Sequence, residues 1–315
     1  MRPDFSIIVT SYFEEDSIDE FITRVLSVMR EHQHNFEIIM VNDGSTDRTF
    51  ERQLELFKSN EEITHLVDLF RNSGQLAAMS CGITHASGKN YVFIDSDLQL
   101  APEELPNLIS EIGNGYDIVS GARQARSEGV LRTFPSKIAN YLMRKIAQHP
   151  ISDFGCTYKI YNAKLVDAFD FGPNKAWKTA FVFRGAEKII EVPVSQKERK
   201  YGSSGWTLRK LVNFLFDHVV GISNRPFLIL TIISLLFGAI IFFRILISFF
   251  IPGGILTNIT NGLVLNVILI GILVSLSCFA ITGEFVFRIF QMTEKDPIYI
   301  EKTHYSRQDG KIHEE

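Results

Sequence analysis

Two long runs of uncharged, mostly apolar residues near the carboxyl end constrain this chain most. The first covers residues 227–251 and is interrupted by one charge, Arg244. The second covers residues 263–281, with Asn266 and two serines as its only polar side chains. At about 1.5 Å of rise per residue, a helix of either length crosses a hydrocarbon layer of roughly 30 Å. We therefore predict a transmembrane hairpin with helices over about 227–251 and 263–283.

The charges around the two runs predict their orientation. Basic residues stand outside the hairpin, whereas its connecting segment, 252–261, carries no charge. They are Arg209, Lys210 and Arg225 before the first run, and Arg288 and Lys295 after the second. By the positive-inside rule, we expect both termini in the cytoplasm of an integral, multi-pass protein of a bacterial inner membrane. The alternative is two buried helices of a soluble core, but such helices rarely run this long without a polar face.

Composition excludes several classes of function. A net charge of −4 and a pI near 6.1 give no general attraction to nucleic acid, so we expect no nucleic-acid partner. Cys81, Cys156 and Cys278 lie far apart without metal-ligand or CxxC spacing, which indicates reduced thiols and a reducing compartment. The amino-terminal residues lack the apolar region of a signal peptide, so we expect none.

The first two hundred residues alternate between strand and helix patterns. Residues 18–29 have apolar side chains at helical spacing, a helix is expected to begin near Gln75, and another apolar helical face lies within 105–112. The expected strands cover 5–10, 36–41, 64–69, 91–94, 117–120 and 188–194. Such alternation predicts an α/β fold, in which a mostly parallel sheet is covered on both faces and binds ligands beyond the carboxyl ends of its strands.

Four regions follow from these patterns. We expect a cytoplasmic catalytic domain over 1–205, an amphipathic helix on the membrane surface over 206–225, the hairpin over 226–290 and a cytoplasmic tail over 291–315. Within the catalytic domain, 131–148 has the pattern of a basic amphipathic helix. The polar residues 303–315 are expected to be disordered.

Three acidic motifs stand where expected strands end. They are Tyr12-Phe-Glu-Glu15, Asn42-Asp-Gly-Ser-Thr-Asp47 and Asp95-Ser-Asp-Leu-Gln99. Each alone is also typical of an ordinary turn. Asp95 and Asp97 are two residues apart and, in extended backbone, present both carboxylates to one site, which suits Mg²⁺ or Mn²⁺ shared with substrate phosphates. Neither GxGxxG nor GxxxxGK[ST] occurs, so the dinucleotide-binding and P-loop interpretations lose their support.

Taken in order, these motifs resemble those of the family-2 inverting glycosyltransferases of GT-A fold. The likeness also includes Arg71-Asn-Ser-Gly-Gln75, Asp153-Phe-Gly-Cys156 and Arg199-Lys-Tyr-Gly-Ser-Ser204, and it covers nearly the whole chain. Within the family, the chain looks most like the polyprenyl-phosphate glycosyltransferases. That group includes dolichyl-phosphate mannose synthase, the bactoprenol glucosyltransferases and undecaprenyl-phosphate aminoarabinose transferase.

The resemblance implies roles by position. Tyr12, Glu14, Asp43, Gly74 and Asp95 would bind the donor nucleotide, and Asp97, with Asp95, would hold Mg²⁺ or Mn²⁺. Asp153 would position the reacting groups, while Arg123, Arg199 and Ser204 would bind the acceptor phosphate. With Asp97 and Asp153, Arg199 is also a candidate catalytic residue. Forked guanidinium groups suit phosphate, in agreement with these assignments.

The implied reaction transfers a sugar, with inversion, from a nucleotide sugar to a polyprenyl phosphate such as undecaprenyl phosphate. UDP is the preferred donor nucleotide and GDP the alternative, and the sugar is open. Family members like this chain form tetramers, so a homo-oligomer is expected. One rival is a processive polysaccharide synthase, but Lys200 stands where its QxxRW motif has tryptophan. The other is a non-catalytic sugar-nucleotide-binding membrane scaffold, against which the intact pair Asp95 and Asp97 argues.

Overall fold

The computed structural model describes residues 2–124, 144, 149–196, 296–308 and 311–315, together with scattered positions between 267 and 289. Two compact units are present, Met1–Thr207 with Pro297–Glu315, and Leu208–Asp296. The strands of the first unit are β1 (Phe5–Ser11), β2 (Phe36–Asn42), β3 (Ile63–Leu69), β4 (Asn90–Phe93), β5 (Ile118–Gln124), β6 (Lys159–Asn162), β7 (Ile189–Ser195), β8 (Glu301–Gln308) and β9 (Lys311–Glu314). Its helices are α1 (Ile18–Glu31), α2 (Thr49–Ser59), α3 (Gln75–His85), α4 (Leu105–Gly113), α6 (Ala163–Asp167) and α7 (Thr179–Gly185), with a 3₁₀ turn at Pro102–Glu104.

All described strands join one sheet in the order β7-β5-β6-β4-β1-β2-β3-β8-β9. Its centre, β4-β1-β2-β3, is parallel, with Ile7 opposite Ile38 and Val92. β6 and β8 run antiparallel to β4 and β3, so the sheet is mixed where the sequence predicted mostly parallel strands. The predicted α/β architecture is confirmed. All six expected strands are present, and their ends differ from the predicted ends by no more than a few residues.

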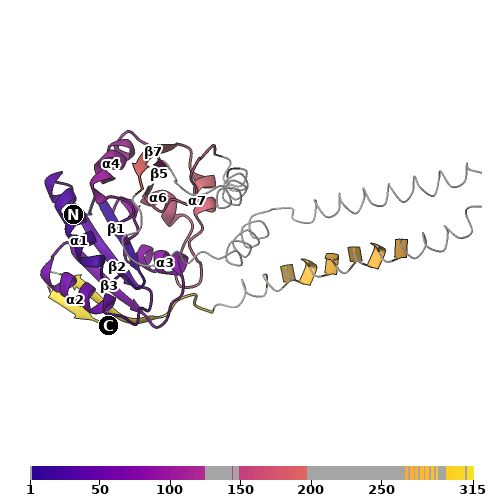
Figure 1. Ribbon diagram of the computed structural model, residues 1–315, viewed down its shortest axis with the longest axis horizontal. Coiled ribbons are helices and arrows are strands. Elements are labelled where there is room, and N and C mark those ends of the chain that lie inside the picture. Colours follow the sequence, from indigo (N-terminus) through magenta and orange to yellow (C-terminus); the bar gives the residue numbers. More distant parts are fainter. Residues whose placement is uncertain are drawn as a thin grey trace, which may run out of the picture. The chain divides into compact units, whose positions relative to one another are not determined.

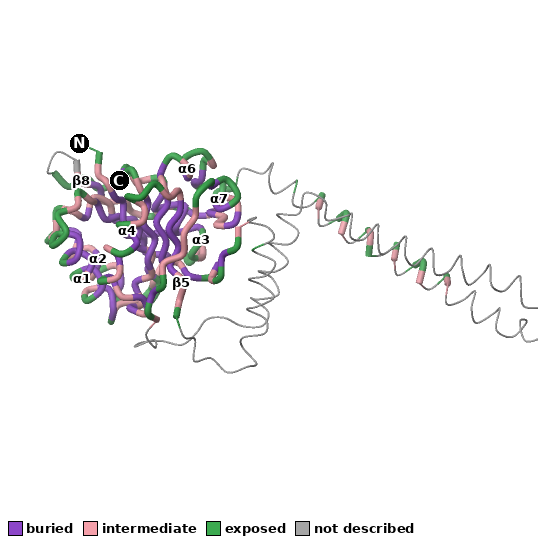
Figure 2. Tube along the Cα trace, turned by 90° about the horizontal axis from the view of Figure 1, so that it is seen from above, coloured by how far each residue is buried: buried purple, intermediate pink, exposed green. Residues whose placement is uncertain are grey.

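Helices cover both faces of this sheet. Figure 1 shows α1, α2 and α4 on one side of the strands and α3, α6 and α7 on the other. On the first face, buried α1 side chains such as Phe21 and Val25 pack with Ile7 and Met40, and the helical spacing predicted for 18–29 is confirmed. Burying one such side chain contributes about 1.5–3 kcal/mol. On the second face, α3 approaches closely, because a Cβ on Gly82 would lie 2.3 Å from the Ile8 side chain. Figure 2 shows the buried residues concentrated in the central strands.

The prediction of a disordered carboxyl-terminal tail is wrong. Residues 301–308 form β8, which pairs antiparallel with β3 and continues into the β8–β9 hairpin. Tyr305 packs against Phe50 and Phe57, and Arg307 Nη2 donates to the carbonyl oxygen of Phe57 at 2.5 Å. The polar composition of the tail concealed this strand, which covers the otherwise unpaired edge of β3.

The predicted membrane segments lie mainly beyond the described residues. The first apolar run, 227–251, the surface helix expected over 206–225 and nearly all of the basic helix expected over 131–148 are outside them. Of the second run, only scattered helical positions are described. Within the described part of the chain, no helix is both long and apolar enough to cross a membrane.

Candidate active site

The predicted motifs meet along one edge of the sheet. Because β4, β1, β2 and β3 are parallel neighbours, their carboxyl ends lie side by side. The segments that leave these ends are 94–99, 12–15, 43–47 and 70–75. β6 is antiparallel to β4, so the segment 153–158 that enters β6 reaches the same edge, as does Arg123 near the end of β5. This is the edge where α/β sheets bind ligands.

Asp43, directly after β2, fixes the backbone of the loop that precedes α3. One carboxylate oxygen accepts a hydrogen bond from Ser73 N at 2.7 Å, and the other accepts from Gly74 N at 3.0 Å and Asn72 Nδ2 at 3.1 Å. The adjoining Gly44, at φ +65°, lies so close to this loop that a Cβ would stand 2.4 Å from the backbone carbon of Arg71. Asp43 is thus a brace between two of the predicted motifs.

The environment of Asp43 works against its charge. Burial raises the pKa of Asp43, and the backbone N–H groups of Ser73 and Gly74 partly offset this rise. Beside it, Asn42 Nδ2 donates to Asp68 Oδ1 at 2.6 Å, and Lys302 Nζ of β8 lies 3.2 Å from Asp68 Oδ2. The carboxyl-terminal strand therefore supports the edge where β2 and β3 end.

Asp95, directly after Ile94, is held between two elements. Gln75 Nε2 donates to its Oδ1 at 2.7 Å, and the hydroxyl of Thr157 donates to Oδ2. Burial, and next the negative charge of Asp97, raise the pKa of Asp95 to about 6, against the opposing effects of Thr157 and Lys159. A cation bound between Asp95 and Asp97 would offset the repulsion between the two carboxylates.

Asp97 lies in a turn that keeps it close to Asp95. Gln99 N donates to Asp97 Oδ1 at 3.1 Å. Leu98, which lies between Asp97 and Gln99, has φ +58°. Both aspartates are partly exposed, so their carboxylates can reach a ligand. Hard carboxylate oxygens fit Mg²⁺ or Mn²⁺, which commonly take one or two carboxylates and complete their shell with water and substrate phosphate. Among the described residues, no cluster of three or more potential ligands forms here, so substrate or water would supply the rest.

Arg123 and Asp153 bind each other. Arg123 Nε and Nη2 donate to the two carboxylate oxygens of Asp153 at 2.6 and 2.8 Å. Burial opposes the charge of Arg123, but the hydrogen bonds to Asp153 and the negative charges of Asp153 and Asp95 together raise the pKa of the guanidinium. Glu191 of β7 fixes the backbone next to Asp153. Its carboxylate accepts hydrogen bonds from Ser152 N at 2.9 Å and from Asp153 N at 3.1 Å. A guanidinium has five N–H donors, and the pair with Asp153 uses two of them.

Lys159, at the start of β6, places a buried amino group near these carboxylates. Its Nζ donates to the carbonyl oxygen of Phe154 at 3.3 Å, and only 2% of the residue is exposed. Burial lowers the pKa of Lys159, against the opposing effects of Cys156 and Asp153. Burial likewise raises the pKa of the Cys156 thiol.

Comparison with known proteins identifies the family to which this chain belongs. The model of the protein family described as glycosyl transferase family 2 matches residues 6–169, slightly more than half of the chain. This chain belongs to glycosyl transferase family 2.

Two curated relatives of this glycosyltransferase bear the same name, undecaprenyl-phosphate 4-deoxy-4-formamido-L-arabinose transferase. The protein from Pseudomonas fluorescens is 31% identical over 230 residues, covering 73% of this chain and 68% of its own. The protein from Klebsiella pneumoniae is 29% identical over 237 residues, covering 75% and 71%. Among solved structures, glucosyl-3-phosphoglycerate synthase from Mycobacterium tuberculosis, in complex with Mn²⁺, UDP and glucosyl-3-phosphoglycerate, has 18% identity and a TM-score of 0.49, covering 69% of this chain and 78% of its own.

The described part of the glycosyltransferase brings most of the predicted site residues to one edge. Asp43, Gly74, Asp95 and Asp97 lie there together, as do Arg123 and Asp153. Tyr12 follows β1 with 43% of its surface exposed. The carboxylate of Glu14 accepts a hydrogen bond from Ser17 at 2.5 Å, so in this structure it serves the start of α1. Arg199 and Ser204 lie outside the described residues.

Four further residues of this glycosyltransferase edge were not among the predicted site residues: Gln75, Thr157, Lys159 and Glu191. Gln75 is part of the Arg71–Gln75 motif. Lys159 stands within the apolar segment Tyr158–Tyr161, and this pattern could have indicated a buried lysine. Thr157 and Glu191 carry no such sign, because their roles depend on contacts with Asp95 and with the Asp153 segment.

Proposed function

We propose that this chain transfers a sugar, with inversion at the anomeric carbon, from a nucleotide sugar to a polyprenyl phosphate. The observation that carries the proposal is the gathering of Asp43, Asp95 and Asp97 beside the Arg123–Asp153 pair at one sheet edge. The acceptor follows from the two relatives, whose names specify undecaprenyl phosphate. The sugar is left open, and UDP is the preferred carrier.

The donor side of the site is the edge formed by β1, β2 and β4. We propose that Tyr12 and the loop braced by Asp43 receive the base and ribose, with Gly74 and Gln75 lining the same edge. Asp97 and Asp95 hold Mg²⁺ or Mn²⁺, which when bound neutralises charge that develops on the departing nucleoside diphosphate. Gln75 and Thr157 orient Asp95 for this task.

The acceptor side is the Arg123–Asp153 pair. A phosphate monoester is mostly dianionic at neutral pH, because its second pKa is near 6, so its oxygen can attack without a strong general base. We propose that the guanidinium N–H groups of Arg123 not used by Asp153 bind this phosphate. Asp153 then acts as a positioning residue that fixes the plane of the guanidinium. Arg199 and Ser204 are proposed as further phosphate ligands.

The predicted hairpin completes the proposal. A polyprenyl chain stays in the bilayer, so an enzyme anchored by helices over 227–251 and 263–283 meets its acceptor at the headgroup level. The cytoplasmic orientation rests on the basic flanks of the hairpin, and a homo-oligomer such as a tetramer is part of the same proposal. Cell fractionation tests the anchor: the chain should pellet with membranes and require detergent for extraction.

The test of function is sugar transfer by the purified full-length chain in detergent. A panel of labelled UDP- and GDP-sugars is offered with undecaprenyl phosphate and Mg²⁺ or Mn²⁺. We expect one donor to give a lipid-linked monosaccharide, with loss of activity in EDTA. Undecaprenol, which lacks the phosphate, serves as the matched control acceptor and should give no product.

Other outcomes separate the rival functions. A polymeric product would support a processive synthase. Binding of a nucleotide sugar without transfer to any acceptor would support a scaffold and overturn the proposal.

A further inference from the structure

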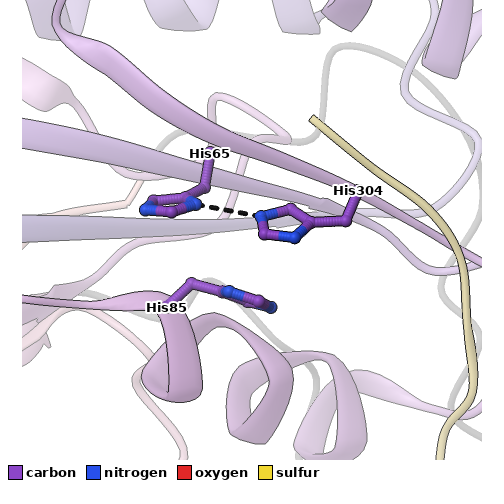
Figure 3. A group of neighbouring side chains, drawn as sticks. All are labelled: His65, His85 and His304. Atoms are coloured by element: carbon purple, nitrogen blue, oxygen red, sulfur yellow. Dashed lines mark hydrogen bonds between the residues drawn. The ribbon is translucent and has the colours of Figure 1, made fainter. Parts of the chain in front are cut away.

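A cluster of three histidines lies between the sheet and α3, away from the edge described above. Figure 3 shows the rings of His65, His85 and His304 gathered at one point. His65 comes from β3, His304 from the adjacent strand β8, and His85 is the last residue of α3. Residues from three elements, two of them 239 positions apart in the sequence, therefore direct imidazoles to a common centre.

The spacing of the rings matches that of ligands around a metal ion. His65 Nδ1 lies 3.0 Å from His304 Nε2, and one nitrogen from each of the three rings falls within 4.8 Å of the others. Zinc binds imidazole nitrogens at about 2.0–2.1 Å, so nitrogens on one ion stand roughly 3.3 Å apart in tetrahedral geometry. Small ring rotations bring this cluster to that arrangement. All three histidines are half-buried, which leaves an ion a route of entry.

The surroundings of His65 and His304 favour the neutral imidazole that a metal requires. Burial, followed by repulsion from His85 and His304, lowers the pKa of His65 to about 4, and burial lowers that of His304. Neutral imidazole offers a lone pair, and one ion can use a lone pair from each ring at once.

A carboxylate supports the cluster from the side. Glu301 Oε1 lies 3.0 Å from His85 Nε2, the relation in which a carboxylate orients a metal-binding histidine. Burial opposes the charge of Glu301, but its interactions with His85, His304 and Cys81 together lower the pKa of the carboxyl. Cys81 Sγ donates a hydrogen bond to the same oxygen at 3.6 Å, so the thiol helps to fix the Glu301 carboxylate.

We propose that His65, His85 and His304 form a binding site for one divalent transition-metal ion, with Zn²⁺ preferred and Glu301 orienting His85. Three histidines with an open fourth position are an ordinary zinc ligand set. The site is separate from Asp95 and Asp97: β3 and β4 are three strand positions apart, or roughly 14 Å at about 4.8 Å per strand.

Such an ion would fasten the carboxyl-terminal strand to the catalytic unit. β8 contributes the ligand His304 and the orienting carboxylate of Glu301, whereas β3 contributes His65 and α3 contributes His85. β8 also supplies Lys302, which pairs with Asp68 near the carboxyl end of β3. The proposed ion is therefore structural, and catalysis does not pass through it.

The experiment uses the full-length chain, stripped with chelator and then kept in excess Mg²⁺ to fill the acidic edge. Co²⁺ is titrated while visible absorption is followed, and Zn²⁺ is then added to displace it. We expect intense ligand-field bands of four-coordinate Co²⁺, saturation at about one ion per chain, and bleaching by Zn²⁺. Zn²⁺ at a hundred times its Kd should raise Tm by about 5–10 °C.

Substitutions then test which residues bind the ion. His85→Gln and His304→Gln should each weaken Co²⁺ binding at least about 100-fold, whereas Glu301→Gln should weaken it about 10–100-fold. His313→Gln, on the exposed strand β9, is the matched control, and Asp97→Asn should leave the spectrum unchanged. If wild type shows no four-coordinate spectrum, or if binding survives in His304→Gln, the proposal is wrong. The wild-type spectrum decides the matter even where a variant fails to fold.

Discussion

Arg123 and Asp153 join through two parallel hydrogen bonds of 2.6 and 2.8 Å, with only 13% and 14% of their side chains exposed. A buried pair of this kind is costly to break, because removal of one partner leaves an uncompensated charge. The pairing also joins β5 to the loop before β6 at the proposed acceptor phosphate.

Arg123→Met should therefore destabilise the chain by about 3–5 kcal/mol and abolish transfer. Arg123→Met combined with Asp153→Asn should recover most of the stability, since no unpaired charge is left, without recovering activity. Thermal unfolding and transfer assays of the two single variants and the double variant complete a double-mutant cycle. Additive losses of stability would show that the pair is not coupled.

Gly44→Ala should damage the donor edge. The added Cβ would stand 2.4 Å from the Arg71 backbone, and the residue has φ +65°, so the loop that Asp43 braces must move. Backbone strain alone costs on the order of 1–3 kcal/mol. We expect a lower Tm and weaker UDP binding by calorimetry.

Gly113→Ala is the matched control for that change. Gly113 ends α4, and apart from its chain neighbours and the backbone of its own helix no described atom lies within 4 Å of the added Cβ. In a helix this substitution is neutral or stabilises by up to about 1 kcal/mol. Equal effects of the two substitutions would contradict the steric argument.

Asp97→Asn should remove metal-dependent catalysis. Loss of one charged oxygen ligand weakens the cation that offsets the leaving-group charge, and we expect turnover to fall by at least about 100-fold. Calorimetry with Mn²⁺ and UDP should show loss of the metal-dependent part of UDP binding. Glu103→Gln, which alters an exposed carboxylate paired with Arg24, is the control and should keep activity. Retained activity in Asp97→Asn would show that the metal site lies elsewhere.

Asp43 gives the stability of the chain a dependence on pH. Burial raises the pKa of Asp43 in the folded state, so its contribution to stability is full below the unfolded pKa of about 3.9 and is lost as pH rises through the raised value. Asp43→Asn does not titrate, and its NH₂ group faces N–H donors, at a cost of about 1–3 kcal/mol.

The variant should thus be less stable than wild type at every pH, by a margin that shrinks as pH rises from acid toward neutrality. Denaturant unfolding of both proteins at several pH values measures this margin. A margin that grows with pH would mean that the N–H groups of Ser73 and Gly74 outweigh burial and hold the pKa down instead.

Much of the candidate site was predictable because its signals are local. The apolar spacing within 5–10, 18–29 and 36–41 fixed strands and a helix, since the side-chain period follows from backbone geometry alone. Polar motifs directly after such strands, at Asp43 and at Asp95 and Asp97, then had to meet at one edge once the strands were parallel neighbours. Residues within one short segment define these features.

The tertiary structure decided what depends on strand order and register. The pairing of Arg123 with Asp153, the support of Asp95 by Thr157, and the position of Glu191 all join different elements. β8 is the clearest case: its polar residues showed no apolar face to predict a strand, yet pairing with β3 satisfies its backbone and directs His304 to His65. Sequence by itself determined which residues each element offers, because periodicity and turn chemistry act over a few residues. Only the packed sheet determined which of them meet, because those contacts depend on the free energy of the whole fold.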